Sequence, residues 1–168
     1  MGYGLLILIH VSCGALWASI AWFFGALLMP AVGEAGPGGP AVVGGLMKRR
    51  MTVYLTGFAT LTVLSGLALY GLRFGLGGAW NAEQGVLALG GLITLHAYGK
   101  GLVVSKPLGE RLGRLGAQIA TTQGKPEPAW LEEMAVGQAK MARIGRATAY
   151  ELLAVLLLMA AHRLAATF

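Results

Sequence analysis

The chain contains three histidines, and each lies in a stretch apolar enough to cross a bilayer. They are His10 in LLILIHVSCGALW, His96 in GGLITLHAYGKG and His162 in VLLLMAAHRLA. An ionisable side chain at membrane depth is costly, so it usually serves an ion pathway, a cofactor or a buried pair. The histidines therefore indicate a class of chemistry, although they do not identify a substrate.

His10 and His162 are predicted to lie at one depth, about 10 Å and about 9 Å below the same face at 1.5 Å per residue. Two neutral imidazoles on different helices can ligate the iron of haem b from opposite sides. Arg73 and Arg163 lie near that face and could pair with the propionates. Aromatic side chains would keep water from the cofactor: Trp17, Trp22, Phe23 and Tyr70. Alternatively, each histidine only hydrogen-bonds a neighbouring helix.

A second polar group is predicted nearer the opposite face. His96 and Lys100 are four residues apart, hence on one face of a helix. Glu151 is about one turn inside the last apolar run, at roughly the depth of Lys100. A Lys100–Glu151 pair would neutralise two costly charges, and this structural role alone would explain why both residues are present. Alternatively, the group relays protons or binds an acidic ligand, and His96 is a haem ligand if the cofactor lies deeper.

The elements that must position these residues follow from composition. Of 168 residues, 56% are hydrophobic and only 12% are charged, against about 25% charged in a soluble domain. Four apolar runs each exceed the ~20 residues that span a bilayer; they cover 3–30, 51–72, 84–105 and 147–168. We therefore predict an all-α fold, a bundle of four transmembrane helices that forms one integral membrane domain over 1–168.

The distribution of basic residues predicts the orientation of this bundle. Eleven of them lie in or beside the first and third connections: Lys48, Arg49, Arg50, Lys100, Lys106, Arg111, Arg114, Lys125, Lys140, Arg143 and Arg146. Only Arg73 and Arg163 lie on the other side. Basic loops stay in the cytoplasm, so both termini are expected outside a bacterial inner membrane. The net charge is +6, and we expect the basic residues to contact anionic lipid head groups rather than nucleic acid.

Three connections join the spans. Val32–Val43 is rich in Gly and Pro and is predicted to be a loop without helical periodicity. Arg73–Glu83 is expected to be a short outer loop. The third connection, 106–146, has leucine and isoleucine at helical spacing and a proline that starts a second periodic stretch. We predict a cytoplasmic helical hairpin, with span three running on to about Thr122 and span four beginning near Ala129. The alternative is two amphipathic helices on the membrane surface.

Four stretches resemble a group of small bacterial membrane proteins. IHVSCGALW resembles the LHxxxxxxW opening shared by the HemJ-type protoporphyrinogen oxidase, the CopD copper-resistance family and related families. MKRRMTVYLTGFATLTVLSGLALY and LHAYGKGLV resemble the start of span two and the HxYxGrLv segment of the HemJ type. ARIGRATAYELLAVLLLMA is similar to the Arg-and-acid start of its last helix.

This resemblance implies a four-helix protein that binds haem b and, in the HemJ type, oxidises protoporphyrinogen IX to protoporphyrin IX. The matching positions are His10, as axial ligand, then His96, Lys100 and Arg50, which would hold porphyrin carboxylates or relay protons, and Glu151. The stretch after Trp17 lacks the aromatic-Pro-Arg-rich end of span one, and the hairpin is longer than in the family. These differences indicate a relative of the family.

We therefore expect a haem b protein that oxidises a tetrapyrrole or passes electrons between quinone-type and haem-type partners, alone or as a homo-oligomer. Whether it is an enzyme stays open at this point. One alternative is a cofactor-free structural subunit of a larger respiratory or photosynthetic complex, docked through its glycine-rich helix faces. Another is a transporter whose path is lined by His96, Lys100 and Glu151.

Overall fold

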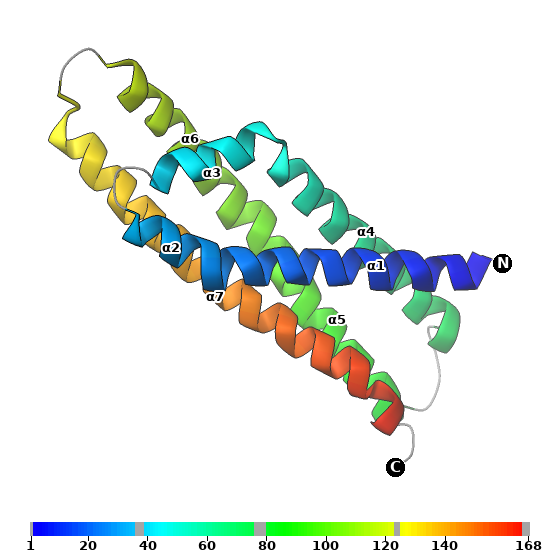
Figure 1. The fold of residues 1–168 in the computed structure, drawn as a ribbon. Coiled ribbons are helices and arrows are strands. Elements are labelled where there is room, and N and C mark those ends of the chain that lie inside the picture. The colour runs from blue at the N-terminus through cyan, green and yellow to red at the C-terminus, as the bar shows by residue number, and fades with distance from the viewer. Residues whose placement is uncertain (1, 36–38, 76–79, 123–124, 166–168) are drawn as a thin grey trace.

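The computed structural model describes residues 2–35, 39–75, 80–122 and 125–165, with backbone alone at 39–41, 120 and 163–165 (Figure 1). This part of the chain is helical with short connections and no strand. The elements are α1 Gly2–Trp22, η1 Phe23–Leu28, α2 Met29–Glu34, α3 Gly39–Lys48, α4 Met51–Phe74, α5 Ala82–Lys100, η3 Gly101–Ser105, α6 Lys106–Thr121 and α7 Pro128–Ala165, where η marks a π-helical turn.

Four continuous helices are long and apolar enough to cross a membrane, as predicted. They are Gly2–Glu34, Met51–Phe74, Ala82–Ile119 and Pro128–His162. Many leucines on their outer faces are more than half exposed, among them Leu64, Leu92 and Leu157. So much exposed apolar surface suits hydrocarbon rather than water, which identifies a multi-pass membrane protein.

The helices are longer than the apolar runs that predicted them. The first extends past 30 to Glu34, the second past 72 to Phe74, and the last two include the polar segments around 106–121 and 128–146. Apolar runs mark only the part in lipid, whereas Ala, Gln, Glu, Lys and Arg continue a helix into water at little cost. Residues 166–168, counted in the fourth run, lie outside the described part of the chain.

The prediction of a non-helical loop over Val32–Val43 was wrong at both of its ends. The first helix continues to Glu34, and α3 begins at Gly39; residues 36–38 between them lie outside the description. Pro40 is the second residue of α3, where the helix needs no backbone N–H, so this proline is compatible with a helix start. A high content of Gly and Pro therefore did not exclude helices here.

Each π-helical turn is followed closely by a proline. η1 precedes Pro30, and η3 precedes Pro107. Proline lacks the backbone N–H, and its ring crowds the carbonyl four residues earlier. A wider turn before the ring relieves that crowding, so the helix continues past the proline. As a consequence, the helix geometry changes directly after Lys100, the last residue of α5.

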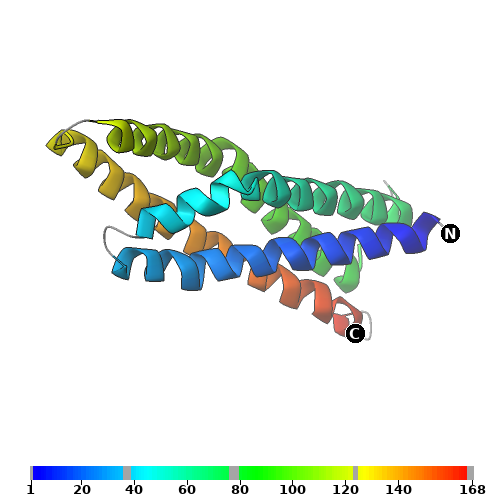
Figure 2. The same ribbon diagram turned by 45° about the horizontal axis from the view of Figure 1, so that its top comes forward.

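The bundle consists of two helix pairs that cross. α1 packs along α4 and α5 along α7, and α1 also crosses α7 (Figures 1 and 2). The pairs meet at a core of buried side chains: Trp17, Ala18, Ala59, Ala97 and Leu152. The start of α1 and the end of α7 lie at one end of the bundle, here called the terminal end. The hairpin of α6 and α7 lies at the other, here called the hairpin end.

Glycines allow two close helix contacts, one at the middle of α7 and one in the hairpin. A Cβ atom on Gly25 would lie 2.5 Å from the carbonyl oxygen of Gly145, so the backbones of the first helix and α7 touch. A Cβ on Gly137 would overlap Leu112, which fixes α6 against α7. Small residues bring helix backbones together in this way in membrane proteins.

Candidate functional site

A glutamate inside the membrane joins a lysine and a histidine. The Nζ atom of Lys100 lies 2.8 and 2.7 Å from the two carboxylate oxygens of Glu151. The Nδ1 atom of His96 lies 3.6 Å from one of them. The Lys100–Glu151 pair predicted from depth is thus confirmed, and we call His96, Lys100 and Glu151 the carboxylate cluster.

The cluster owes its position to the packing of α5 on α7. His96 and Lys100 are one turn apart on α5, and they flank Ala97, which is 1% exposed in the core. Leu152, the neighbour of Glu151 on α7, is 3% exposed and belongs to the same core as Ala97. The small side chain of Ala97 beside the charged ones lets the two helices approach, and the distance between α5 and α7 then suits a direct ion pair.

Glu151 lies about one turn inside the apolar part of α7, which follows Arg146. Its neighbour Leu152 belongs to the core of the bundle. The side chains of Lys100 and Glu151 are 17% and 26% exposed, so each charge is stabilised chiefly by the other.

His96 is the open side of the cluster. Its side chain is 67% exposed, although ionisable groups at this depth usually face the bundle interior or a partner. The cluster therefore presents an imidazole and an adjoining ammonium–carboxylate pair to whatever lies beside α5 in the bilayer. Such a group can donate hydrogen bonds to an acidic ligand that arrives through the lipid, or pass a proton between His96 and Glu151.

His10 contacts the backbone of α4. Its Nδ1 atom lies 2.9 Å from the carbonyl oxygen of Thr62 and 3.4 Å from the hydroxyl of Ser65. A Cβ on Gly66 would lie 2.7 Å from the Cε1 atom of His10, so the ring occupies space that the glycine leaves. A carbonyl only accepts, which makes Nδ1 the protonated nitrogen and leaves the Nε2 lone pair for another partner.

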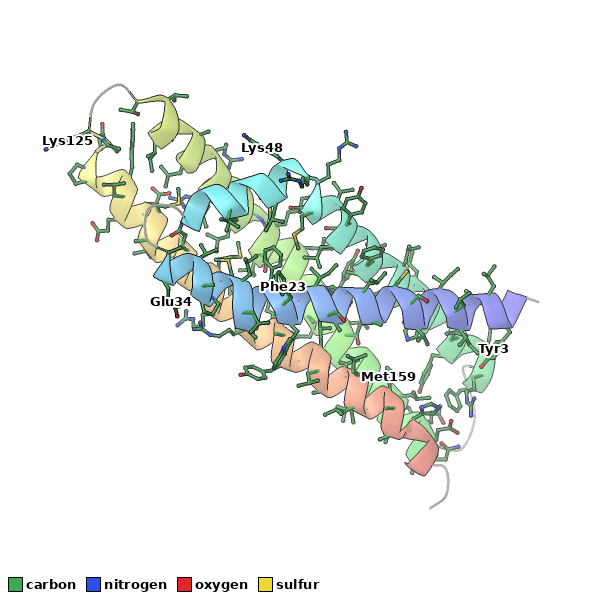
Figure 3. The ribbon with its side chains drawn as sticks, in the orientation of Figure 1. Tyr3, Phe23, Glu34, Lys48, Lys125 and Met159 are labelled. Atoms are coloured by element: carbon green, nitrogen blue, oxygen red, sulfur yellow. The ribbon has the colours of Figure 1, made fainter. Side chains whose placement is uncertain are left out.

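His162 belongs to a different group, at the terminal end. Its Nδ1 donates to the carbonyl oxygen of Met159, and its Nε2 lies 3.9 Å from Oε1 of Glu83. The same oxygen accepts a hydrogen bond of 2.6 Å from Arg73. Tyr3 lies at the same end of the bundle (Figure 3). Arg73, predicted to meet a haem propionate, is thus paired with a glutamate of α5.

His10 and His162 have different neighbours. His10 is bonded to α4, whereas His162 is bonded within α7 and faces Glu83 of α5, and no hydrogen bond or ion pair among the described residues joins the two rings. Their pairing as ligands of one haem stays a prediction.

The remaining predicted residues are Arg50, Arg163 and four aromatic side chains. Arg50 is exposed at the corner before α4, with φ of 58°, and no hydrogen bond or ion pair within the described chain links it to the carboxylate cluster. The side chain of Arg163 lies outside the description. The four aromatic residues do not form one wall: Trp17 is buried against Tyr98, Trp22 meets Tyr150, Phe23 meets Phe24 and Tyr70 meets Phe74.

Several site residues were missed from the sequence. They are the partners of the histidines and a tyrosine that ties helices together: Thr62, Ser65, Gly66, Glu83 and Tyr98. The Tyr98 hydroxyl lies 2.9 Å from that of Thr60 and so joins α5 to α4. The available signal was the run of Thr and Ser in span two, since hydroxyl groups in a span often serve a neighbouring helix.

Replacing Gly66 by alanine is expected to displace the His10 ring, because the new methyl group would overlap Cε1. The bond to Thr62 would then break, and His10 would change from the Nδ1–H tautomer to a mixture. The ¹⁵N shifts of labelled histidine report this directly by NMR. Gly71→Ala is the matched control on the same helix, since a Cβ there meets nothing within 4 Å. Unchanged His10 shifts in Gly66→Ala would contradict the assigned contact.

No group of three or more His, Cys, Asp or Glu side chains gathers in the described residues to hold a metal ion. A metal held through His10 would therefore need most of its ligands from a ring such as a porphyrin. No protein-family model, curated protein or solved structure matches the chain. His10 and the carboxylate cluster are therefore the residues from which a function is inferred.

Proposed function

We propose that this chain is a haem b-binding membrane protein that acts as a protoporphyrinogen-type tetrapyrrole oxidase or as an electron-transfer protein. The observation that carries the proposal is the bond from His10 Nδ1 to the Thr62 carbonyl. Metal-ligating histidines commonly donate one ring N–H to a backbone carbonyl, which fixes the ring and raises the basicity of the other nitrogen. His10 has this arrangement within an apolar helix.

The residues fit one axial ligand better than two. Nε2 of His10 is the free nitrogen, whereas Nε2 of His162 faces the carboxylate of Glu83. His10 would thus hold the iron, and Gly66 provides the space that the ring needs beside α4. Bound haem b would supply one-electron redox chemistry, while the chain fixes its position and excludes water.

The carboxylate cluster supports the substrate half of the proposal. A tetrapyrrole is an apolar ring with carboxylates, so it partitions into lipid and would approach the open side of α5. Lys100 and His96 then offer two donors for a carboxylate, and Glu151 is the base nearest to His96. Arg50 would act from the exposed corner at the hairpin end only on a ligand long enough to reach it.

The same proposal includes the membrane and the orientation. The α6–α7 hairpin and the corner at Lys48–Arg50 carry most of the basic residues. Basic segments are retained in the cytoplasm, so the hairpin end would face inward and both termini outward, across a bacterial inner membrane.

The reduced-minus-oxidised optical spectrum of detergent-purified protein tests haem binding. We expect a b-type spectrum in the wild type and at least a tenfold loss of bound haem in His10→Ala, because the only free imidazole nitrogen beside α4 would be gone. His162→Ala is the matched control, and it should retain the spectrum because its ring already serves Met159 and Glu83. Protoporphyrinogen IX would then be the first substrate to try.

Two outcomes would change this proposal. Loss of the spectrum in both variants would favour ligation by two histidines after a rotation of α1 or α7. A wild type that carries no haem and cannot be reconstituted with it would exclude the haem function.

The exposure of His96 favours a second candidate, a subunit of a larger membrane complex. A partner helix placed on α5 would cover the imidazole and complete the carboxylate cluster. Migration of the protein in mild detergent distinguishes the two candidate functions. A subunit should migrate with a larger assembly, whereas an oxidase should migrate alone or as a homo-oligomer.

A further inference from the structure

We propose that a groove between α4 and the start of α6 binds the phosphate of an anionic phospholipid, with an acyl chain lying along α4. The groove measures about 470 Å³ and is lined by α4 residues from Thr52 to Leu61 and by Lys106. It is separate from His10 and from the carboxylate cluster, and it goes beyond the proposed haem function.

The lining combines one charged residue with hydroxyl groups and apolar residues. Lys106 and Thr52 are exposed. Along α4, Val53, Gly57 and Leu61 are apolar, whereas Thr56 and Thr60 carry hydroxyl groups. A phosphate would therefore lie beside Lys106, and an acyl chain over Val53, Gly57 and Leu61.

Charge complementarity identifies the head group as anionic. The Lys106 ammonium lines the groove, and Arg49 and Arg50 are exposed directly before α4, within one turn of Thr52. None of the lining residues is acidic; the first acid after Lys106 is Glu110, one turn along α6. Basic pockets between transmembrane helices bind anionic lipid head groups in this way.

Two hydroxyl groups that line the groove differ in how strongly they are already hydrogen-bonded. The Thr60 hydroxyl donates to the Thr56 carbonyl at 2.8 Å and contacts the Tyr98 hydroxyl, so it is already engaged. The Thr52 hydroxyl donates only to the sulfur of Met47, at 3.2 Å, and thioether sulfur is a weak acceptor. A phosphate oxygen would be the stronger acceptor, so Thr52 and Lys106 together provide the donors for it.

The test uses Gly57→Leu, which fills the groove. A Cβ at Gly57 meets nothing within 4 Å, so the variant should fold. Gly71→Leu is the matched control, since it adds the same side chain in open space on the same helix, outside the groove. Lys106→Gln removes the ammonium, and Lys140→Gln in the hairpin helix is its control.

Each protein would be reconstituted in nanodiscs of phosphatidylglycerol and phosphatidylcholine, and retained lipid would be counted by native mass spectrometry. We expect one phosphatidylglycerol retained per wild-type chain. Gly57→Leu and Lys106→Gln should each lower its occupancy about tenfold, and both controls should keep it. Soluble glycerol 3-phosphate should not compete, because the acyl chain contributes to binding.

Equal retention in Gly57→Leu, Lys106→Gln and the wild type would overturn the proposal. Retention of phosphatidylcholine as strong as that of phosphatidylglycerol would also overturn it, and so would full competition by glycerol 3-phosphate. Because Lys106 is exposed, its variant keeps the test valid even if Gly57→Leu does not fold. None of these outcomes depends on haem, so they are distinct from a failure of the proposed function.

Discussion

Replacing Glu151 by leucine should lower the free energy of unfolding by about 3 kcal/mol, because the Lys100 ammonium would lose its only bonded carboxylate inside the bilayer. Removing one partner of a buried ion pair leaves the other charge unpaired and costs about 3–5 kcal/mol, and we take the lower value because Lys100 is nearer the end than the centre of its apolar run. Thermal unfolding in detergent, or reversible unfolding in SDS, measures the change. The fall should persist at high salt, since lipid and protein shield the pair from ions.

The double variant Lys100→Met/Glu151→Leu should recover most of the lost stability, because it removes both charges and keeps apolar volume between α5 and α7. Glu133→Leu is the matched control: its partner Arg111 is 66% exposed in the hairpin, and such surface pairs contribute only about 0–1 kcal/mol. If Glu151→Leu were as stable as the wild type, Lys100 would have to reach water, and the cluster would not be an intramembrane site.

The double variant also separates structure from chemistry. A pair that only neutralises two charges can be replaced without loss of activity once stability is restored. A pair that holds a tetrapyrrole carboxylate or relays a proton cannot. Oxidase activity, or the occupancy of bound porphyrin, in this stable variant therefore decides between the two roles of Lys100 and Glu151.

The carboxylate cluster was predictable from the sequence because its members constrain one another strongly. His96 and Lys100 share a helix face by spacing alone, and Glu151 is the one acid within the last span. An isolated lysine and an isolated glutamate at one depth each need a partner. Pairing Lys100 with Glu151 neutralises both charges, so the depths of the two residues were sufficient to predict the pair without any knowledge of helix rotation.

The sequence does not determine whether His10 and His162 face one another, because a histidine does not need a charged partner. A neutral imidazole is satisfied by a single carbonyl, and Thr62 and Met159 provide one each. Depth then leaves the direction of each ring undetermined. The direction of His10 follows from Gly66, whose missing side chain makes room for the ring, and one glycine among the chain's 27 gives no sign of this in the sequence.

The sequence also gives no sign of the glycine contact that holds η1 against α7, and this contact leads to the other large expected effect. Gly25→Leu should lower the free energy of unfolding by about 3 kcal/mol, the upper end for overpacking. Even a Cβ atom there would lie 2.5 Å from the Gly145 carbonyl oxygen, and this neighbour is backbone, which cannot turn aside as a side chain can. Thermal unfolding in detergent measures the loss.

The damage should extend to the core, because Trp17 and Ala18 are buried where α1 crosses α7 beside Leu152. Separating the helices at Gly25 would expose Trp17, so its fluorescence, read in a variant with the other three tryptophans replaced by phenylalanine, should shift. Gly99→Leu is the control, since a Cβ there meets nothing within 4 Å and leucine favours helix over glycine by up to about 1 kcal/mol. Equal stability of Gly25→Leu and Gly99→Leu would mean that the two helices do not touch at Gly145.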